Sequence, residues 1–277
     1  MRGRRPGAGG FTLIEVIVVI AVISILAAMA VPYAVKIIDQ SREEATKKEM
    51  EAIHRAIMGD PQVPTAGYLG DMGALPATLV PLNTQGAQAG QTTGTLGVKY
   101  GWYGPYVNAG FDAAGYLADG WGTNYSWNNP GAGQIRSAGA DRAFNTADDM
   151  IYPPFAVVPV GQLQVNLYVW RTDNTTSQYV LNPQPGSFPG MAVSVQMFYS
   201  VNGVRSAVPL SAGIPPGPSG PPYLFSTPSP YNPPRTHTGF HEVFATCTLP
   251  PNPQVGGRAV VYMPENNQQA QVNLYLR

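Results

Sequence analysis

Cysteine, histidine and charged side chains are all scarce in this sequence of 277 residues. The one cysteine, Cys247, excludes an intramolecular disulfide framework, a four-cysteine zinc site and a CxxC redox motif. Charged residues make up 12% of the chain, about half the share that is usual in globular proteins. The 16 basic residues balance the 16 acidic ones, and a neutral chain of this kind is not typical of proteins that bind nucleic acid.

Catalytic motifs are missing as well. The sequence contains no GxSxG elbow, no Walker loop and no GxGxxG turn. His241-Glu242 begins a zinc-protease motif, but Ala245 occupies the position of its second histidine. His237 and His241 could share a metal, yet the sequence offers no evident third ligand. The sequence therefore does not indicate an enzyme, and a membrane-anchored enzyme is the third of three interpretations.

Apolar residues, by contrast, are concentrated near the N-terminus. From Val16 to Val35 no residue carries a formal charge, and this length is close to one membrane span. Arg2, Arg4 and Arg5 precede the apolar run, so the positive-inside rule places the N-terminus in the cytoplasm. The sequence thus predicts a single membrane-spanning helix.

An acidic residue, Glu15, stands at the start of this apolar run. An unpaired carboxylate at the bilayer centre costs about 2.5–3.5 kcal/mol. The small residues Gly9 and Gly10 lie before the run, so cleavage after Gly10 would leave the hydrophobic helix on the product, unlike cleavage of an ordinary secretory signal. The amino group created at Phe11 could then neutralise Glu15 of the same or a neighbouring chain.

The string GFTLIE, from Gly10 to Glu15, resembles the prepilin-peptidase motif of the type IV pilin and pseudopilin superfamily. The resemblance implies cleavage between Gly10 and Phe11, N-methylation of Phe11, and contact of Glu15 with the neighbouring subunit's amine during filament assembly. It also implies a single-pass inner-membrane protein that enters a periplasmic or cell-surface filament. The alternative is an uncleaved anchor with an acid at its start by chance.

The helix should continue beyond the membrane. Residues 36–58 contain no glycine or proline, and Gly59-Asp60-Pro61 is a typical end signal. Pro32 removes one hydrogen bond inside the helix. The sequence therefore predicts a leader at residues 1–10 and a helix within residues 11–60, and the lack of a persistent heptad argues against a coiled coil.

Residues 61–155 read as a small head. Aromatic residues alternate with turn residues in two segments, 100–106 and 119–127, which favours a small antiparallel sheet packed on the helix. A stacking platform for sugars or nucleic acid is the functional alternative.

Three carboxylates, Asp141, Asp148 and Asp149, fall in a loop rich in glycine and alanine. Calcium takes six to eight oxygen ligands and would relieve their repulsion, but a solvated acidic turn is equally compatible with the residues. Over residues 5–152 the chain resembles the major pseudopilins of type II secretion. That resemblance implies Ca²⁺ bound by Asp141, Asp148 and Asp149, with Ala138 supplying a backbone carbonyl.

Residues 156–277 run beyond the usual end of that family and read as a β-rich domain. Val201-Asn202-Gly203-Val204 is a hairpin signal. The pentapeptide QVNLY occurs at residues 164–168 and again at 271–275, which fits either a duplicated module or two similar strands. Strands are expected at 165–170, 191–201, 240–249, 258–263 and 272–276.

The predicted fold is α+β: a long N-terminal helix packed on a small antiparallel sheet, followed by an all-β, sandwich-like domain. The predicted function is a structural subunit of a pilin-like filament, either a type II secretion pseudopilus or a type IV pilus. Its expected partners are prepilin peptidase, identical or related pilin subunits, the inner membrane before assembly, and the secretion or pilus machinery, but no nucleic acid. The second interpretation is a low-copy minor pilin whose β-domain binds a surface, a secreted substrate or a partner.

Overall fold

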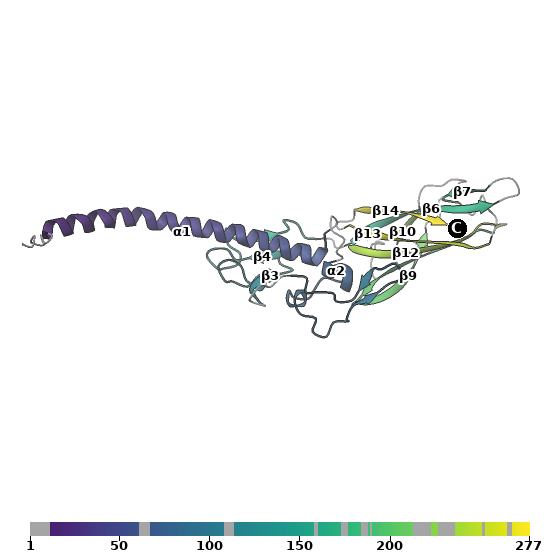
Figure 1. The fold of residues 1–277 in the computed structure, drawn as a ribbon, viewed down its shortest axis with the longest axis horizontal. Coiled ribbons are helices and arrows are strands. Elements are labelled where there is room, and N and C mark those ends of the chain that lie inside the picture. The colour runs from purple at the N-terminus through teal and green to yellow at the C-terminus, as the bar shows by residue number, and fades with distance from the viewer. Residues whose placement is uncertain are drawn as a thin grey trace, which may run out of the picture.

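The computed structural model describes residues 12–60, 67–107, 114–157, 160–172, 177–183, 188, 190–212, 223–226, 236–250, 253–264 and 268–277. One long helix leads into a head of short elements, which is followed by a β-rich region at the far end (Figure 1). The predicted α+β fold is therefore confirmed. The expected leader and the cleavage site between Gly10 and Phe11 lie outside the described residues.

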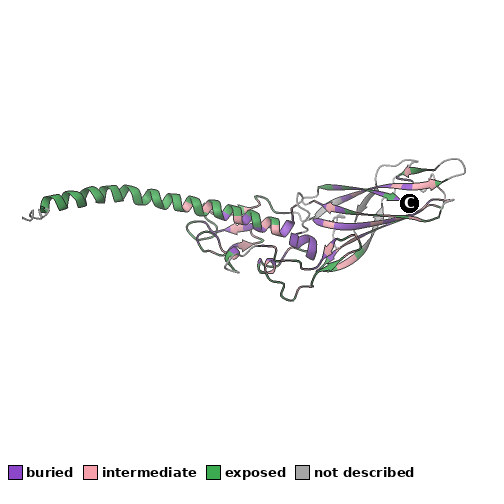
Figure 2. Cartoon of the chain, in the orientation of Figure 1, coloured by how far each residue is buried: buried purple, intermediate pink, exposed green. Residues whose placement is uncertain are grey.

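The N-terminal helix α1 (Leu13–Met58) is continuous over 46 residues and includes Pro32. It ends where the sequence predicts, at Gly59, whose positive φ of 83° suits glycine and whose N–H donates to the Arg55 carbonyl. Its N-terminal half is exposed, whereas its C-terminal half packs on the head (Figure 2). The buried positions follow a helical period and are Thr46, Met50, Ile53, Ile57 and Met58.

The head holds the second half of α1 in a small core. Met50, Ile53 and Ile57 of α1 pack with aliphatic and aromatic side chains of the head. Hydrogen bonds add to this contact: the Tyr125 hydroxyl donates to Glu49 at 2.7 Å. The elements of the head are α2 (Gly67–Met72), the 3-10 turns η1 (Val80–Leu82) and η2 (Gly115–Leu117), the pair β1 (Thr92–Thr93) and β2 (Lys99–Tyr100), and the antiparallel sheet β3 (Ser126–Trp127), β4 (Ile135–Ser137) and β5 (Met150–Tyr152).

The β-rich region is one nine-stranded sheet that folds over a common core. Two edges of the sheet meet, because the Arg277 N–H donates to the Gly256 carbonyl at 3.3 Å. Glycine allows this approach: a Cβ on Gly257 would lie 2.6 Å from the carbonyl oxygen of Tyr275. The strands are β6 (Val160–Thr172), β7 (Ser177–Leu181), β8 (Ala192–Val201), β9 (Val204–Ala212), β10 (Tyr223–Ser226), β11 (Thr236–His237), β12 (Gly239–Thr248), β13 (Val255–Met263) and β14 (Gln269–Leu276).

The two QVNLY segments lie side by side. Strand β14 pairs with β6 in parallel, whereas the other pairings in this sheet are antiparallel. The register places each residue of 164–168 opposite its identical counterpart in 271–275. The central apolar residues of both copies, Val165, Leu167, Val272 and Leu274, point into the same core. The two copies of the pentapeptide are therefore neighbouring strands of one sheet.

The head and the β-rich region share a polar boundary. Glu242 of β12 lies on the outer side of the sheet and is nevertheless fully buried. Its Oε1 accepts from the Leu96 N–H at 2.5 Å, and its Oε2 accepts from Nη2 of Arg205 at 2.7 Å. A Cβ on Gly94 would lie 2.5 Å from the same carboxylate, so this glycine permits the close approach. At the boundary, a backbone N–H of the head thus binds a buried carboxylate that is paired with Arg205 inside the β-rich region.

Candidate assembly site and acidic loop

The N-terminus of α1 is closed by a reciprocal cap. The Thr12 hydroxyl accepts from the Glu15 N–H at 3.4 Å, and Glu15 Oε2 accepts from the Thr12 N–H at 3.0 Å. Such a capping box satisfies two backbone donors that a helix terminus otherwise leaves free. Glu15, predicted as an assembly residue, therefore also has a local role in starting the helix.

The first half of α1 presents an apolar surface on all sides. It contains an 18-residue window with a mean hydropathy of 2.9, and none of that window is buried. Large side chains along it, such as Ile14, Ile25 and Met29, are mostly exposed. Hydrophobic residues around the whole circumference are typical of a helix that is surrounded by lipid or by other protein. A helix like this in water would cost about 25 cal/mol for each Å² of apolar surface.

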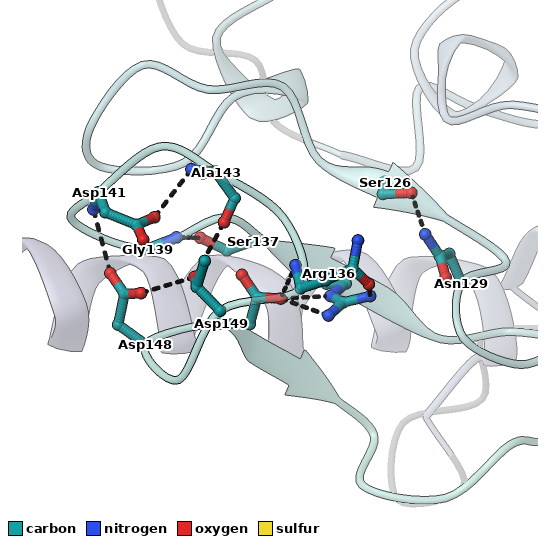
Figure 3. A network of polar contacts seen from close by, with 11 residues as sticks. Ser126, Asn129, Arg136, Ser137, Gly139, Asp141, Ala143, Asp148 and Asp149 are labelled. Carbon is teal, nitrogen blue, oxygen red and sulfur yellow. Dashed lines mark hydrogen bonds and ion pairs between the residues drawn. The ribbon is translucent and has the colours of Figure 1, made fainter.

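The acidic loop between β4 and β5 brings two of the predicted ligands together (Figure 3). Asp148 Oδ2 accepts from the Asp141 N–H at 3.0 Å, and Asp148 Oδ1 accepts from the Thr146 hydroxyl at 2.8 Å. The hydrogen bond from Asp141, followed by that from Thr146, lowers the pKa of Asp148 below its usual value. The loop backbone is close by, because a Cβ on Gly139 would lie 2.6 Å from Asp148 Oδ2.

The third predicted ligand, Asp149, faces a different group. Its Oδ2 accepts from Nε of Arg136 at 2.7 Å and from the Asn145 N–H at 2.7 Å, and it forms an ion pair with Nη2 of the same guanidinium. Its Oδ1 is buried and has no hydrogen-bond partner in the described part of the chain. Ala138, the predicted carbonyl ligand, is fully buried. Within the described residues, no three side chains of His, Cys, Asp or Glu converge as a metal-binding group.

The sequence reasoning assigned no role to two polar residues of β4 that lead into this loop. Arg136 balances the charge of Asp149, and Ser137 donates to Asp119 at 2.6 Å and accepts from the Gly139 N–H at 3.2 Å. Both precede the acidic segment on β4, where Arg136 alternates with buried neighbours. The signal that could have identified the pair of Arg136 and Asp149 is an arginine on the strand directly before a run of acidic residues.

Over 148 residues the chain is 29% identical to the type II secretion system core protein G of Escherichia coli (strain K12), and the match spans 51% of this chain and 88% of that protein. Residues 5–31 match the family described as the prokaryotic N-terminal methylation motif. That segment contains Gly10, Phe11 and Glu15. Both findings support a relationship of the N-terminal portion of this chain to the pilin and pseudopilin superfamily.

The similarity of this pilin-like chain to protein G lies over the N-terminal portion. Most of the β-rich region therefore has no counterpart in that relative. No solved structure matches the chain significantly. The chain thus differs from protein G by a second folded region, at the end of the molecule that lies away from the N-terminus of α1 (Figure 1).

Proposed function

We propose that this chain is a structural subunit of a pilin-like filament of the type II secretion kind. The observation that carries the proposal is the exposed apolar half of α1, which begins at the capped Glu15 within the methylation motif. Lipid covers the apolar surface of this helix before assembly, and the helices of neighbouring subunits cover it afterwards. Subunits that contact one another head to tail through such a helix build an open, helical array.

The proposal includes a processing step. Prepilin peptidase cuts between Gly10 and Phe11 on the cytoplasmic side, and Phe11 is methylated. The arginines ahead of the motif support the orientation through the positive-inside rule. Intact-mass analysis of the protein from native membranes tests this step: we expect a chain that starts at methylated Phe11, whereas an intact Met1 terminus would contradict it.

Glu15 then guides assembly through its charge. Two substitutions separate this role from helix capping. Glu15→Gln keeps the capping box, because a glutamine side chain can serve in the same position. It removes the negative charge that would attract a neighbour's amine. We expect Glu15→Gln to insert into the membrane and remain helical but to assemble poorly.

Filament yield after shearing measures assembly, and membrane fractionation measures insertion. Thr12→Val is the matched control, since it breaks the hydroxyl half of the cap and leaves the Glu15 charge in place. If Glu15→Gln assembles like the wild type while Thr12→Val fails, then Glu15 is a capping residue and the proposed charge pairing is wrong.

The acidic loop binds Ca²⁺ in this proposal. Asp141 and Asp148 lie together at the loop surface, and the glycine at 139 leaves room for a backbone carbonyl from the 138–140 segment to approach them. The buried, unpartnered Oδ1 of Asp149 also supports a cation nearby, because a buried carboxylate oxygen without a partner is unfavourable. The ion would stabilise the loop, not carry out chemistry, and we propose that the subunit has no catalytic activity.

A minor, low-copy subunit is the second candidate. The β-rich region favours it, because this region is additional to the part that resembles protein G. Quantifying the chain in sheared filaments distinguishes the two candidates: a major subunit is the dominant protein, and a minor subunit is scarce.

A further inference from the structure

The outer surface of β6, β7 and β14 carries a cluster of aromatic side chains. Tyr168 and Tyr275 stack with ring centroids 4.7 Å apart and planes inclined by 16°. Tyr179 meets Tyr275 nearly at right angles, with centroids 5.6 Å apart, and it meets Trp170 in the same way at 4.9 Å. In spite of these contacts, Tyr275 is 56% exposed and Tyr179 is 40% exposed. The cluster is therefore rigidly packed and still open to solvent.

The register of the two QVNLY segments creates this arrangement. Side chains alternate along each strand, so the core takes the valine and leucine of each copy and the outer face takes the glutamine, asparagine and tyrosine. The parallel, in-register pairing then sets identical residues beside each other: Gln164 by Gln271, Asn166 by Asn273, and Tyr168 by Tyr275. Rows of neutral amides thus lead into a row of aromatic rings.

The amide row is ordered by hydrogen bonds. The Leu167 N–H donates to Asn182 Oδ1 at 2.8 Å, Asn182 Nδ2 donates to Asn166 Oδ1 at 3.3 Å, and Asn166 Nδ2 donates to Asn273 Oδ1 at 3.0 Å. This chain of bonds fixes the orientation of the Asn273 amide. Its Nδ2 is left as an exposed donor beside the aromatic row, without a partner in the described part of the chain.

Charge limits the kind of ligand. The described outward residues of β6, β7 and β14 carry no charged side chain; Arg277, which directly follows β14, places its guanidinium over the Trp170 ring at 5.2 Å. Single-stranded nucleic acid needs a basic groove beside stacking aromatics, and an acidic peptide needs more than one cation. A neutral ligand that offers both an apolar ring face and hydroxyl groups fits this surface better.

We propose that the aromatic face formed by Tyr168, Trp170, Tyr179 and Tyr275 binds the sugar rings of a neutral polysaccharide. A pyranose ring has C–H groups on its faces and hydroxyls around its rim. Its face would lie on an exposed tyrosine ring, and its hydroxyls would exchange hydrogen bonds with Asn273 and Gln271. Because the aromatic and amide groups are already held in place, little side-chain entropy is lost on binding.

The inference goes beyond the proposed filament function and does not depend on it. The face lies on the β-rich region, far from the apolar half of α1 (Figure 1). An assembled filament would keep α1 inside and could therefore present this face outward. Binding by the unassembled chain, however, requires no filament, so a failure of assembly would leave this inference standing.

The test is calorimetric titration of the full-length chain in detergent micelles. The probes are neutral hexasaccharides of β-1,4-glucose, α-1,4-glucose, β-1,4-N-acetylglucosamine and α-1,6-mannose. We expect at least one to bind, with an affinity that changes little with salt because no phosphate or carboxylate is involved. Tyr275→Ala should weaken binding at least tenfold, and Tyr275→Phe should retain most of it because the ring remains. Asn273→Ala should weaken binding several-fold.

Tyr103→Ala is the matched control, because Tyr103 is 53% exposed but lies in the head. It should bind like the wild type, and thermal unfolding of each variant establishes that the fold is kept. The inference is overturned if none of the four probes binds, or if Tyr275→Ala binds as well as the wild type. It is also overturned if Tyr275→Ala abolishes self-association in sedimentation without changing sugar binding, since the face would then be a contact between copies.

Discussion

Removing the positive charge of Arg205 should separate the unfolding of the head from that of the β-rich region. In Arg205→Met the apolar part of the side chain can still cover the Phe198 ring, over which the guanidinium lies at 3.6 Å. The fully buried Glu242 carboxylate, however, loses its cation. Taking one partner from a buried ion pair costs about 3–5 kcal/mol. We expect a loss of this size in the free energy of unfolding.

The reverse change, Glu242→Gln, should be milder. The amide oxygen can still accept from the Leu96 N–H, and the Arg205 side chain, 28% exposed, can turn toward water. A loss of about 1.5–3 kcal/mol is expected, as for a single hydrogen bond to a charged group. Arg258→Met is the matched control, because Arg258 lies over the Phe244 ring at 6.0 Å and has no ion pair in the described part of the chain. Its effect should stay within about 0.5 kcal/mol.

Equilibrium unfolding in urea, with the full chain in micelles, measures these differences. In a Trp170→Phe background, the fluorescence of Trp102, Trp121 and Trp127 reports on the head alone. Far-ultraviolet circular dichroism reports on the whole chain, including the strands of the β-rich region. The two signals should change together in the wild type and apart in Arg205→Met. The reasoning is refuted if Arg205→Met is as stable as Arg258→Met, or if the two signals already differ in the wild type.

Three further results are expected. Calcium at one hundred times its dissociation constant should stabilise the head by about 2.7 kcal/mol, and Asp148→Ala should unfold like chelated wild type; equal unfolding with and without calcium would leave the loop a solvated turn. Burial lowers the pKa of His54 from 6.5 to about 4. As the pH drops, this histidine is therefore protonated first in the unfolded chain, and the free energy of unfolding falls by about 3 kcal/mol between these two pH values. His54→Gln should lack this component, and identical pH profiles would disprove it. Burial raises the pKa of Asp71 from 3.8 to about 7, so its carboxyl destabilises the fold increasingly as the pH rises through this range. Asp71→Asn, which can still accept from Tyr106, should therefore be more stable than the wild type at pH 8, and a loss of stability there would contradict this reasoning.

Local signals were sufficient to predict the elements near the start of the chain and its tightest turn. Gly59 ends α1 because its positive φ suits glycine, and this requirement is visible in the sequence. Asn202 and Gly203 take φ values of 50° and 80°, which are the values that a two-residue hairpin turn needs. Such signals depend on a few neighbouring residues, so no knowledge of the remaining chain is required.

Contacts between distant segments could not be predicted in the same way. Alternation identified 165–170 and 272–276 as strands, but it does not specify which strand pairs with which, or in which direction. Glu242 has the sequence context of an outward, solvated residue, but it is buried, with Leu96 of the head and Arg205 of β9 on its carboxylate. The acidic loop was predicted as three converging carboxylates, and Arg136 draws one of them aside. That arginine had entered no motif.

The parallel partnership of β6 and β14 sets an order of events for the growing chain. The paired asparagines are 107 residues apart, and β14 follows every other described strand of the sheet. Strand β6 is therefore synthesised long before β14 and gains this neighbour only when nearly all of the β-rich region has been made. During that interval Val165 and Leu167 lack the apolar partners that Val272 and Leu274 provide. A chain that is truncated before residue 269 lacks β14 and should be readily cut by protease. A chain that includes β14 should be resistant.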